Sequence, residues 1–207
     1  MVQLLGAFRR ERNGLVADTM HYEGARYGLN YGVSLPTVRR LVHELEPNYD
    51  NALAAFLATQ EVRCLRLAAL HLVDPESLHD LVTADRWLAF LTNSELAEEA
   101  AYALLSRSSA FDALFRRTVL SAQPYASYAL VMAAARRTDP SIEWLELSSQ
   151  VLMRQPDRLL MQAVTGLWAH LANHCEAWKE QVNSRLLTLP EGPIADYLRD
   201  ELAWRIL

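Results

Sequence analysis

The sequence predicts an all-α protein whose helices form repeated pairs, and three observations support this prediction. Apolar residues recur at helical spacing in short segments, among them CLRLAALHL, EEAAYALL, YALVMAAA and LMQAVTGLWAHL. No segment shows the strict alternation of a half-buried strand. No glycine lies between Gly32 and Gly166, so the tight glycine turns of β-hairpins are missing from the middle of the chain.

The first helices and a turn are predicted over residues 1–33. Residues 1–13 form an amphipathic pattern that ends near Asn13 and Gly14, a common place for a helix to stop. The next helix is predicted to start at Ser34, whose hydroxyl can cap a free backbone N–H. Pro36 suits the first turn of that helix because its missing N–H would have had no partner there.

Later helix boundaries are indicated by capping residues and prolines. Ser94 is followed by Glu98 in a pattern close to a capping box, which favours a helix start at this point. Helices of roughly 10–17 residues with short connections predict antiparallel neighbours. The predicted boundaries lie at Asp50, Asp74-Pro75, Asn93-Ser94, Pro124, Asp139-Pro140, Pro156-Asp157 and Pro193.

Similar helix pairs begin near Asp50, Ser94 and Pro140, a spacing of about 45 residues that suits HEAT-type repeats. We therefore predict a single HEAT-like helical-repeat domain over residues 1–207, with N-terminal helices and a turn over 1–33 and helix-pair repeats over 34–207. Such repeats wind into a curved α-solenoid. An irregular helical bundle is the alternative.

The charge of the chain is unevenly distributed. The net charge of −5 counts against indiscriminate binding to nucleic acid. Residues 67–115 carry two arginines and eight acidic residues, whereas residues 116–158 carry six arginines and four acidic residues. The basic residues are 19 arginines and one lysine, Lys179. Arginine is the better bidentate phosphate ligand, so this bias fits a DNA-facing surface, although a GC-rich genome would produce the same bias.

Cysteine and histidine usage indicates a cytoplasmic chain without a metal or cofactor. Cys64 and Cys175 lie far apart and form no motif, as expected for two buried thiols in the cytosol. His170, His174 and Cys175 form an H-x-x-x-H-C pattern on one helix, but no carboxylate completes a metal-binding set, which favours an ordinary polar helix face. No apolar run approaches about 18 residues, so no membrane span is expected.

Residues 32–41, GVSLPTVRRL, resemble the "GV..P..R.L" pattern of the HEAT-like-repeat alkylpurine DNA glycosylases, the AlkD-like DNA alkylation repair family. The helix pair that follows, ALAAFLATQEVRCLRLAALHL, is similar to the next family segment, with Arg63, Ala68, Ala69 and Leu70 at matching places. MQAVTGLW, from residue 161 to residue 168, resembles a late family helix. The resemblance implies a solenoid whose basic concave face grips duplex DNA.

The catalytic pattern of that family is changed in this sequence. The resemblance implies catalysis by two tryptophans and an aspartate, the first Trp and the Asp within T-K-S-W-W-D-x-x-D, and the matching stretch is TNSELAEEA, residues 92–100. Glu95 and Leu96 stand in place of tryptophans, Ala97 in place of the aspartate and Ala100 in place of the second aspartate. The resemblance therefore implies a retained scaffold whose glycosylase chemistry is lost or altered.

Three residues are candidates for what remains of that chemistry. Release of a cationic base creates an oxocarbenium-like sugar, which a carboxylate stabilises while aromatic faces hold the base. Glu98 and Glu99 are the candidates for the carboxylate, and Trp168 is the candidate aromatic side chain of a cleft. The sequence is compatible both with an enzyme and with a protein that has lost catalysis.

Six arginines of the basic segment fall in successive predicted helices. Corresponding positions of a repeat protein line one surface, so these arginines are candidates for a phosphate-binding stripe. Alternatively they complement helix C-termini and pair with Asp139, Glu143 or Asp157. The six are Arg116, Arg117, Arg136, Arg137, Arg154 and Arg158.

The sequence thus supports three functions in order. The first is a DNA-associated repair-family protein with duplex DNA as its partner. The second is a scaffold that binds a protein or peptide on the same surface, which the acidic total charge favours. The third is a divergent glycosylase that uses Glu98 or Glu99.

Overall fold

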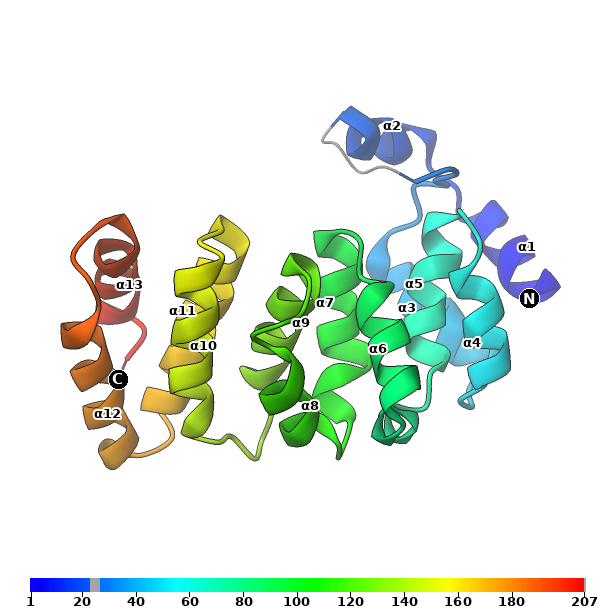
Figure 1. Cartoon of the computed structure of the whole chain (residues 1–207). Helices are drawn as coiled ribbons and strands as arrows, with labels where there is room; N and C mark the ends of the chain where they lie inside the picture. Colours follow the sequence, from blue (N-terminus) through cyan, green and yellow to red (C-terminus); the bar gives the residue numbers. More distant parts are fainter. Residues whose placement is uncertain (23–26, 207) are drawn as a thin grey trace. The chain divides into compact units, whose positions relative to one another are not determined.

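The computed structural model describes residues 1–22 and 27–206; residues 23–26 of the predicted N-terminal turn, and Leu207, lie outside the described residues. The described residues form thirteen α-helices, two short 3-10 helices and one isolated bridge, with no strand, which confirms the all-α prediction (Figure 1). Within these ranges no helix is long and apolar enough to cross a membrane. The helices are α1 (Val2–Arg10), α2 (Gly14–Tyr22), α3 (Leu35–Leu45), α4 (Asn51–Ala58), α5 (Arg63–Leu72), η1 (Pro75–His79), α6 (Leu81–Ala89), α7 (Ser94–Ala103), η2 (Leu105–Arg107), α8 (Phe111–Thr118), α9 (Pro124–Ala134), α10 (Glu143–Arg154), α11 (Arg158–Ala172), α12 (Glu176–Thr188) and α13 (Pro193–Ala203).

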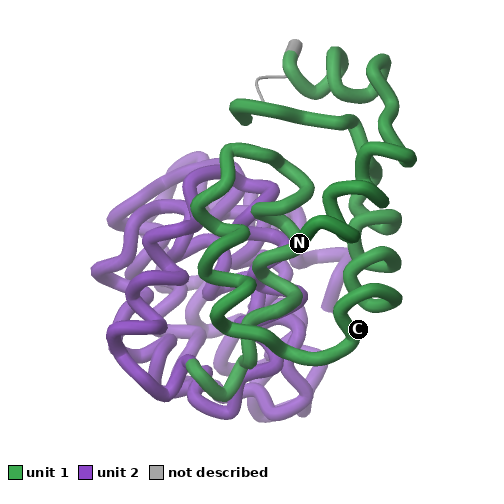
Figure 2. The backbone as a smooth tube through the Cα atoms, turned by 90° about the vertical axis from the view of Figure 1, so that its right-hand side faces the viewer, with its two compact units in different colours: residues 1–77 green, residues 78–207 purple. Residues whose placement is uncertain are grey.

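The described chain divides into two compact units, residues 1–77 and residues 78–207 (Figure 2). The first unit contains α1 to α5 and buries Phe8 and Leu57 among its apolar side chains. The second contains α6 to α13 and buries Phe111, Trp144 and Trp168. Each unit therefore has an apolar core, and a single domain over residues 1–207 stays a prediction.

In the first unit, the segment before α3 is fixed to the start of α5. Leu29 bridges Val62: its N–H donates to the Glu61 carbonyl oxygen at 2.8 Å, and its own carbonyl accepts from the Arg63 N–H at 2.9 Å. The Arg63 side chain is 3% exposed and donates to the Val33 carbonyl oxygen at 2.6 Å. These bonds join the start of the stretch that resembles the glycosylase family to the second helix of its helix pair.

The structure corrects the predicted end of the first helix. α1 ends at Arg10, and Asn13 with Gly14 begins α2 instead of ending α1. The side-chain oxygen of Asn13 accepts from the Val16 N–H at 3.3 Å, as an N-capping residue does. Asparagine and glycine occur at both kinds of helix end, so the dipeptide alone did not distinguish them.

Three of the other predicted helix starts are confirmed by capping bonds, and Pro124 and Pro193 are the first residues of α9 and α13 as predicted. Ser34 accepts from the Thr37 N–H at 3.3 Å, and Asp50 accepts from the Leu53 N–H at 2.9 Å. Asp157 caps α11 in the same way.

Three of the predicted starts differ in detail. After Asp139-Pro140, α10 begins only at Glu143 and has no side-chain capping bond. Asn93, rather than Ser94, caps α7: its side-chain oxygen accepts from the Leu96 N–H at 2.9 Å. Asp74-Pro75 begins only the short η1, and α6 starts after Asp80, which accepts from the Thr83 N–H at 2.9 Å.

In the second unit, α7, α9, α11 and α13 pack against one another in sequence (Figure 1). They start at residues 94, 124, 158 and 193, so the repeat is 30 to 35 residues long rather than about 45. The repeat is shorter because each predicted unit of about 45 residues contains three α-helices instead of two, such as α7, α8 and α9 between residues 94 and 134. Buried alanines such as Ala97, Ala129 and Ala163 allow the close approach of these helices.

Gly32 is required by the backbone of the first unit. Its φ of +68° lies in the left-handed region, and a Cβ there would overlap the carbonyl oxygen of Asn13. Asn13 is held at this place because its N–H donates to the Tyr31 carbonyl oxygen at 2.7 Å. Gly166 in α11 is the opposite case, since a Cβ there meets no atom within 4 Å.

We expect Gly32→Ala to lower the free energy of unfolding by about 2 kcal/mol or more, because strain and overlap add. Gly166→Ala is the matched control and should raise it by up to about 1 kcal/mol, because alanine is the better helix former. Urea denaturation followed by circular dichroism measures both values. Equal effects of the two substitutions would contradict the described backbone at Gly32.

Candidate functional site

A surface pocket of about 320 Å³ opens on one side of α7, α9 and α11. Its size is at the lower end of the range for small-molecule sites. The three helices lie side by side in the second unit, α9 between the other two (Figure 1). The pocket-lining residues include Glu98 from α7, Tyr128, Met132 and Arg136 from α9 and its end, and Gln162 and Gly166 from α11.

The repeat spacing brings three polar residues of the pocket to the same level. Glu98, Tyr128 and Gln162 are each four residues beyond the start of their helix, at Ser94, Pro124 and Arg158 respectively. Because the helices pack in sequence, equal steps along each of them place these side chains in one row.

A hydrogen bond connects the first two residues of this row. The Tyr128 hydroxyl donates to Oε1 of Glu98 at 3.0 Å. Burial raises the pKa of Tyr128, and the Glu98 carboxylate raises it further, whereas the cation of Arg136 acts in the opposite direction. Tyr128 therefore stays neutral at physiological pH and remains a donor to the carboxylate.

Arg136 and Gln162 leave their polar groups accessible to a ligand. Arg136 is exposed, and its Nη1 donates to the Met132 carbonyl oxygen at 2.8 Å. In residues 1–22 and 27–206, Arg136 has no carboxylate partner and the Gln162 amide forms no hydrogen bond. The pocket thus combines an acceptor, a cation and an amide that can both donate and accept.

Only one of the two predicted carboxylates lines the pocket. Glu98 is exposed there, whereas Glu99 is 0% exposed. Successive residues of a helix are rotated by about 100°, so these neighbours lie on different faces of α7.

The structure corrects the expectation for Trp168 as an aromatic side chain of a cleft. Trp168 is 0% exposed, and its indole N–H donates to the Ser148 hydroxyl at 2.9 Å. Buried tryptophans normally need such a partner for the N–H. Trp168 is therefore part of the core between α10 and α11.

Arg116 and Arg117 of α8 belong to ion pairs. Arg116 pairs with Asp112 at 2.9 Å and also with Glu143, and Arg117 pairs with Asp85 at 2.8 Å. The predicted pairing with Glu143 is present. These contacts agree with the structural alternative for the two arginines.

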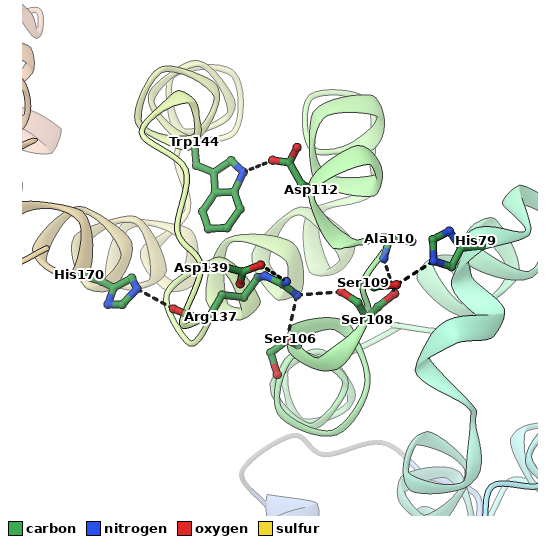
Figure 3. Close-up of polar contacts among 10 residues, drawn as sticks. All are labelled: His79, Ser106, Ser108, Ser109, Ala110, Asp112, Arg137, Asp139, Trp144 and His170. Carbon is green, nitrogen blue, oxygen red and sulfur yellow. Dashed lines mark hydrogen bonds and ion pairs between the residues drawn. The ribbon is translucent and has the colours of Figure 1, made fainter.

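Arg137 links the segment after α9 to residues 106–111 of the second unit (Figure 3). Its Nη1 donates to the carbonyl oxygens of Ser106 at 3.0 Å and Ser108 at 2.8 Å, and its Nη2 pairs with Asp139 at 2.7 Å. The guanidinium also lies over the Phe111 ring, 5.0 Å from its centroid. The side chain is 11% exposed, so Arg137 stabilises the fold and offers little to a ligand.

Arg154 at the end of α10 and Arg158 at the start of α11 are both exposed. Nη1 of Arg154 donates to the Leu120 carbonyl oxygen at 3.4 Å, a long bond. Arg158 is one turn before Gln162 and therefore shares its face of α11. The described part of the chain contains no ion pair of Arg158. Of the six predicted arginines, Arg136 and Arg158 are the ones free to face a ligand beside the pocket.

Sequence reasoning missed Tyr128, Gln162 and Gly166 as site residues. The Tyr128 side chain is mostly buried, and its hydroxyl donates to Glu98. The signal that could have found them is the repeat itself, because Glu98, Tyr128 and Gln162 are 30 and 34 residues apart. With the predicted spacing of about 45 residues, these three positions do not correspond to one another, so the row was not predicted.

The histidines of the H-x-x-x-H-C pattern have other contacts. His170 shares a hydrogen bond of 2.9 Å with the Arg137 carbonyl oxygen, and His174 stacks on Trp178 with ring centroids 4.5 Å apart. Over the described ranges, no group of three or more His, Cys, Asp or Glu residues could hold a metal ion.

No family model matches the sequence, and no curated protein matches it. A solved structure does match, with a TM-score of 0.72 and 13% sequence identity, over 98% of this chain and 94% of that chain. That protein is described as one of a new family related to the HEAT-like repeat DNA glycosylases, with affinity for branched DNA structures. At this identity the likeness establishes the fold, and it confirms the predicted HEAT-like helical repeats.

We expect Arg137→Met to lower the free energy of unfolding by about 2–4 kcal/mol, because two carbonyl groups lose a charged donor. Methionine keeps an apolar side chain over Phe111, so the loss reports mainly the hydrogen bonds. Denaturation by urea, followed through the helical signal, measures the change. Arg154→Met is the exposed control and should stay within about 0.5 kcal/mol; an equally small effect of Arg137→Met would contradict its structural role.

Proposed function

We propose that this protein is a DNA-associated HEAT-like-repeat protein that binds DNA without cleaving its glycosidic bonds. DNA would lie on the exposed face of α7, α9 and α11, with the pocket beneath it. The observation that carries the proposal is the pair of exposed arginines on this face, Arg136 and Arg158, within a fold whose solved relative has affinity for branched DNA.

Two arginines on one face suit a few phosphate contacts. Both are exposed, and neither forms an ion pair within the described residues, so phosphate binding would not have to break an ion pair inside the protein. The net charge of −5 opposes non-specific binding along a duplex. A branched or distorted DNA, which a protein can recognise by shape, is therefore a better partner than a long regular duplex.

A protein or peptide partner on the same face is the second candidate function. Glu98 favours it, because a carboxylate in the middle of the face attracts cationic side chains and repels phosphate. The two candidates differ in their dependence on Arg136 and Arg158. A cationic peptide would gain affinity when these arginines are removed, whereas DNA would lose affinity.

A divergent glycosylase is the third candidate, and the pocket supports it least. Such chemistry needs aromatic faces around the cationic base in addition to a carboxylate. Glu98 supplies a carboxylate, but Tyr128 is 6% exposed and presents its hydroxyl, and Trp168 is buried. The residues present fit binding better than base removal.

We expect the protein to bind a labelled four-way DNA junction more tightly than a duplex of the same length, with an affinity that falls as salt rises. Arg136→Ala with Arg158→Ala should weaken junction binding about tenfold or more, and should reduce the salt dependence by about two phosphate contacts. Fluorescence anisotropy over a sodium chloride series measures both effects.

The matched control is Arg116→Ala with Arg117→Ala, which removes the same charge from arginines already engaged in ion pairs. This variant should bind the junction nearly as well as the unaltered protein. Equal losses in the two double variants would refute the proposed face. Absence of binding to any DNA at low salt would refute DNA association itself.

We further expect no release of free base from DNA that contains N7-methylguanine or N3-methyladenine. Chromatographic separation of released bases after prolonged incubation with excess protein tests this expectation. Release that is lost in Glu98→Gln would show instead that Glu98 performs glycosylase chemistry.

A further inference from the structure

The pocket in the proposed DNA-binding face has a chemistry that does not suit phosphate. Glu98 is exposed in it, and a carboxylate repels the phosphate backbone. Arg136 on the same pocket can contact phosphate, but Glu98 cannot. The partner group of Glu98 must therefore be a hydrogen-bond donor.

One oxygen of Glu98 is available for such a donor. Oε1 accepts from the Tyr128 hydroxyl at 3.0 Å, which fixes the orientation of the carboxylate. In the part of the chain that the structure describes, Oε2 has no hydrogen-bond partner. Gln162, in the same row, has a free amide that can donate to a carbonyl or ring nitrogen of the same ligand.

Gly166 and its surroundings leave space for a flat group. A Cβ at Gly166 meets no atom within 4 Å, so packing within the protein does not require glycine at this position. Glycine inside a helix is less favourable than alanine. Its Cα surface, together with Met132 and Ala163, offers an apolar wall on which a planar ring can lie.

We infer that this pocket receives one unpaired DNA base that carries an exocyclic amine, which is adenine, cytosine or guanine but not thymine. The inference rests on the proposed DNA association and deepens it. The amine would donate to Oε2 of Glu98, and the ring would lie against Gly166 and Met132. Arg136 would hold the adjoining phosphate.

This assignment also gives the protein a way to distinguish branched DNA from a regular duplex. In a duplex the base amine on the Watson–Crick edge is already paired, and the base is stacked between its neighbours. Bases at a branch or bulge are more easily unstacked, which lowers the cost of placing one in a pocket. Glu98 would then act as a specificity residue, while Arg136 and Arg158 supply affinity.

The test compares DNA duplexes that carry a single bulged nucleotide, either cytosine or thymine, in otherwise identical sequence. We expect the protein to bind the bulged cytosine about ten- to a hundredfold more tightly, the value of one hydrogen bond to a charged acceptor. Glu98→Gln keeps an oxygen for the Tyr128 hydroxyl and turns an N–H₂ donor toward the pocket, so the preference should disappear or reverse. Competition anisotropy at one salt concentration measures both ratios.

Gly166→Leu provides a second variant that does not depend on charge. Its side chain would fill the space beside Gly166 and should remove the preference for cytosine while leaving the helical signal and the salt-dependent binding of duplex intact. Equal binding of both bulges, or a cytosine preference that survives Glu98→Gln, overturns the inference and leaves the proposed DNA association standing. Failure to bind any of the DNAs overturns the DNA association as well.

Discussion

The close packing of α7, α9 and α11 is the constraint on which the candidate site depends. Buried alanines at the contacts bring these helices near one another, and each helix begins at a capped residue or at a proline. The register that results places Glu98, Tyr128 and Gln162 in one row. Arg137 stabilises this register. It lies just after α9, and its side chain donates to the carbonyl oxygens of Ser106 and Ser108, which follow α7. A slip of one residue along α7 would replace Glu98 in the row by a buried neighbour.

Electrostatics divides the arginines into those used by the fold and those available to a partner. Arg116 and Arg117 are engaged with acidic side chains, and Arg137 is almost buried. Such engaged arginines contribute little long-range field, because their charge is compensated locally. Arg136 and Arg158 remain: Arg136 lines a pocket that contains a carboxylate, and Arg158 lies one helical turn before Gln162 of the same pocket. This combination of few cations and one central acceptor suits selective recognition of one ligand group better than non-specific attraction.

The same pocket explains why the fold alone does not imply base removal. A glycosylase must hold a cationic base between aromatic faces while a carboxylate stabilises the sugar. This chain has the carboxylate of Glu98, but the tryptophan expected in a cleft lies in the core, bonded to Ser148. Function therefore has to be argued from the residues of the site and not from the fold, since one fold supports many chemistries.

The sequence by itself determined the all-α class and most helix starts, because capping and helical periodicity are local properties. It also selected Glu98 and Arg136, two residues of the pocket. Only the tertiary structure decided that Trp168 and Glu99 are buried, that Arg137 stabilises the fold, and that Tyr128 and Gln162 complete the site. Those outcomes depend on which face of each helix meets its neighbours. The buried face of each helix is set by contacts between residues about 30 positions apart. Local sequence patterns contain no information about such contacts.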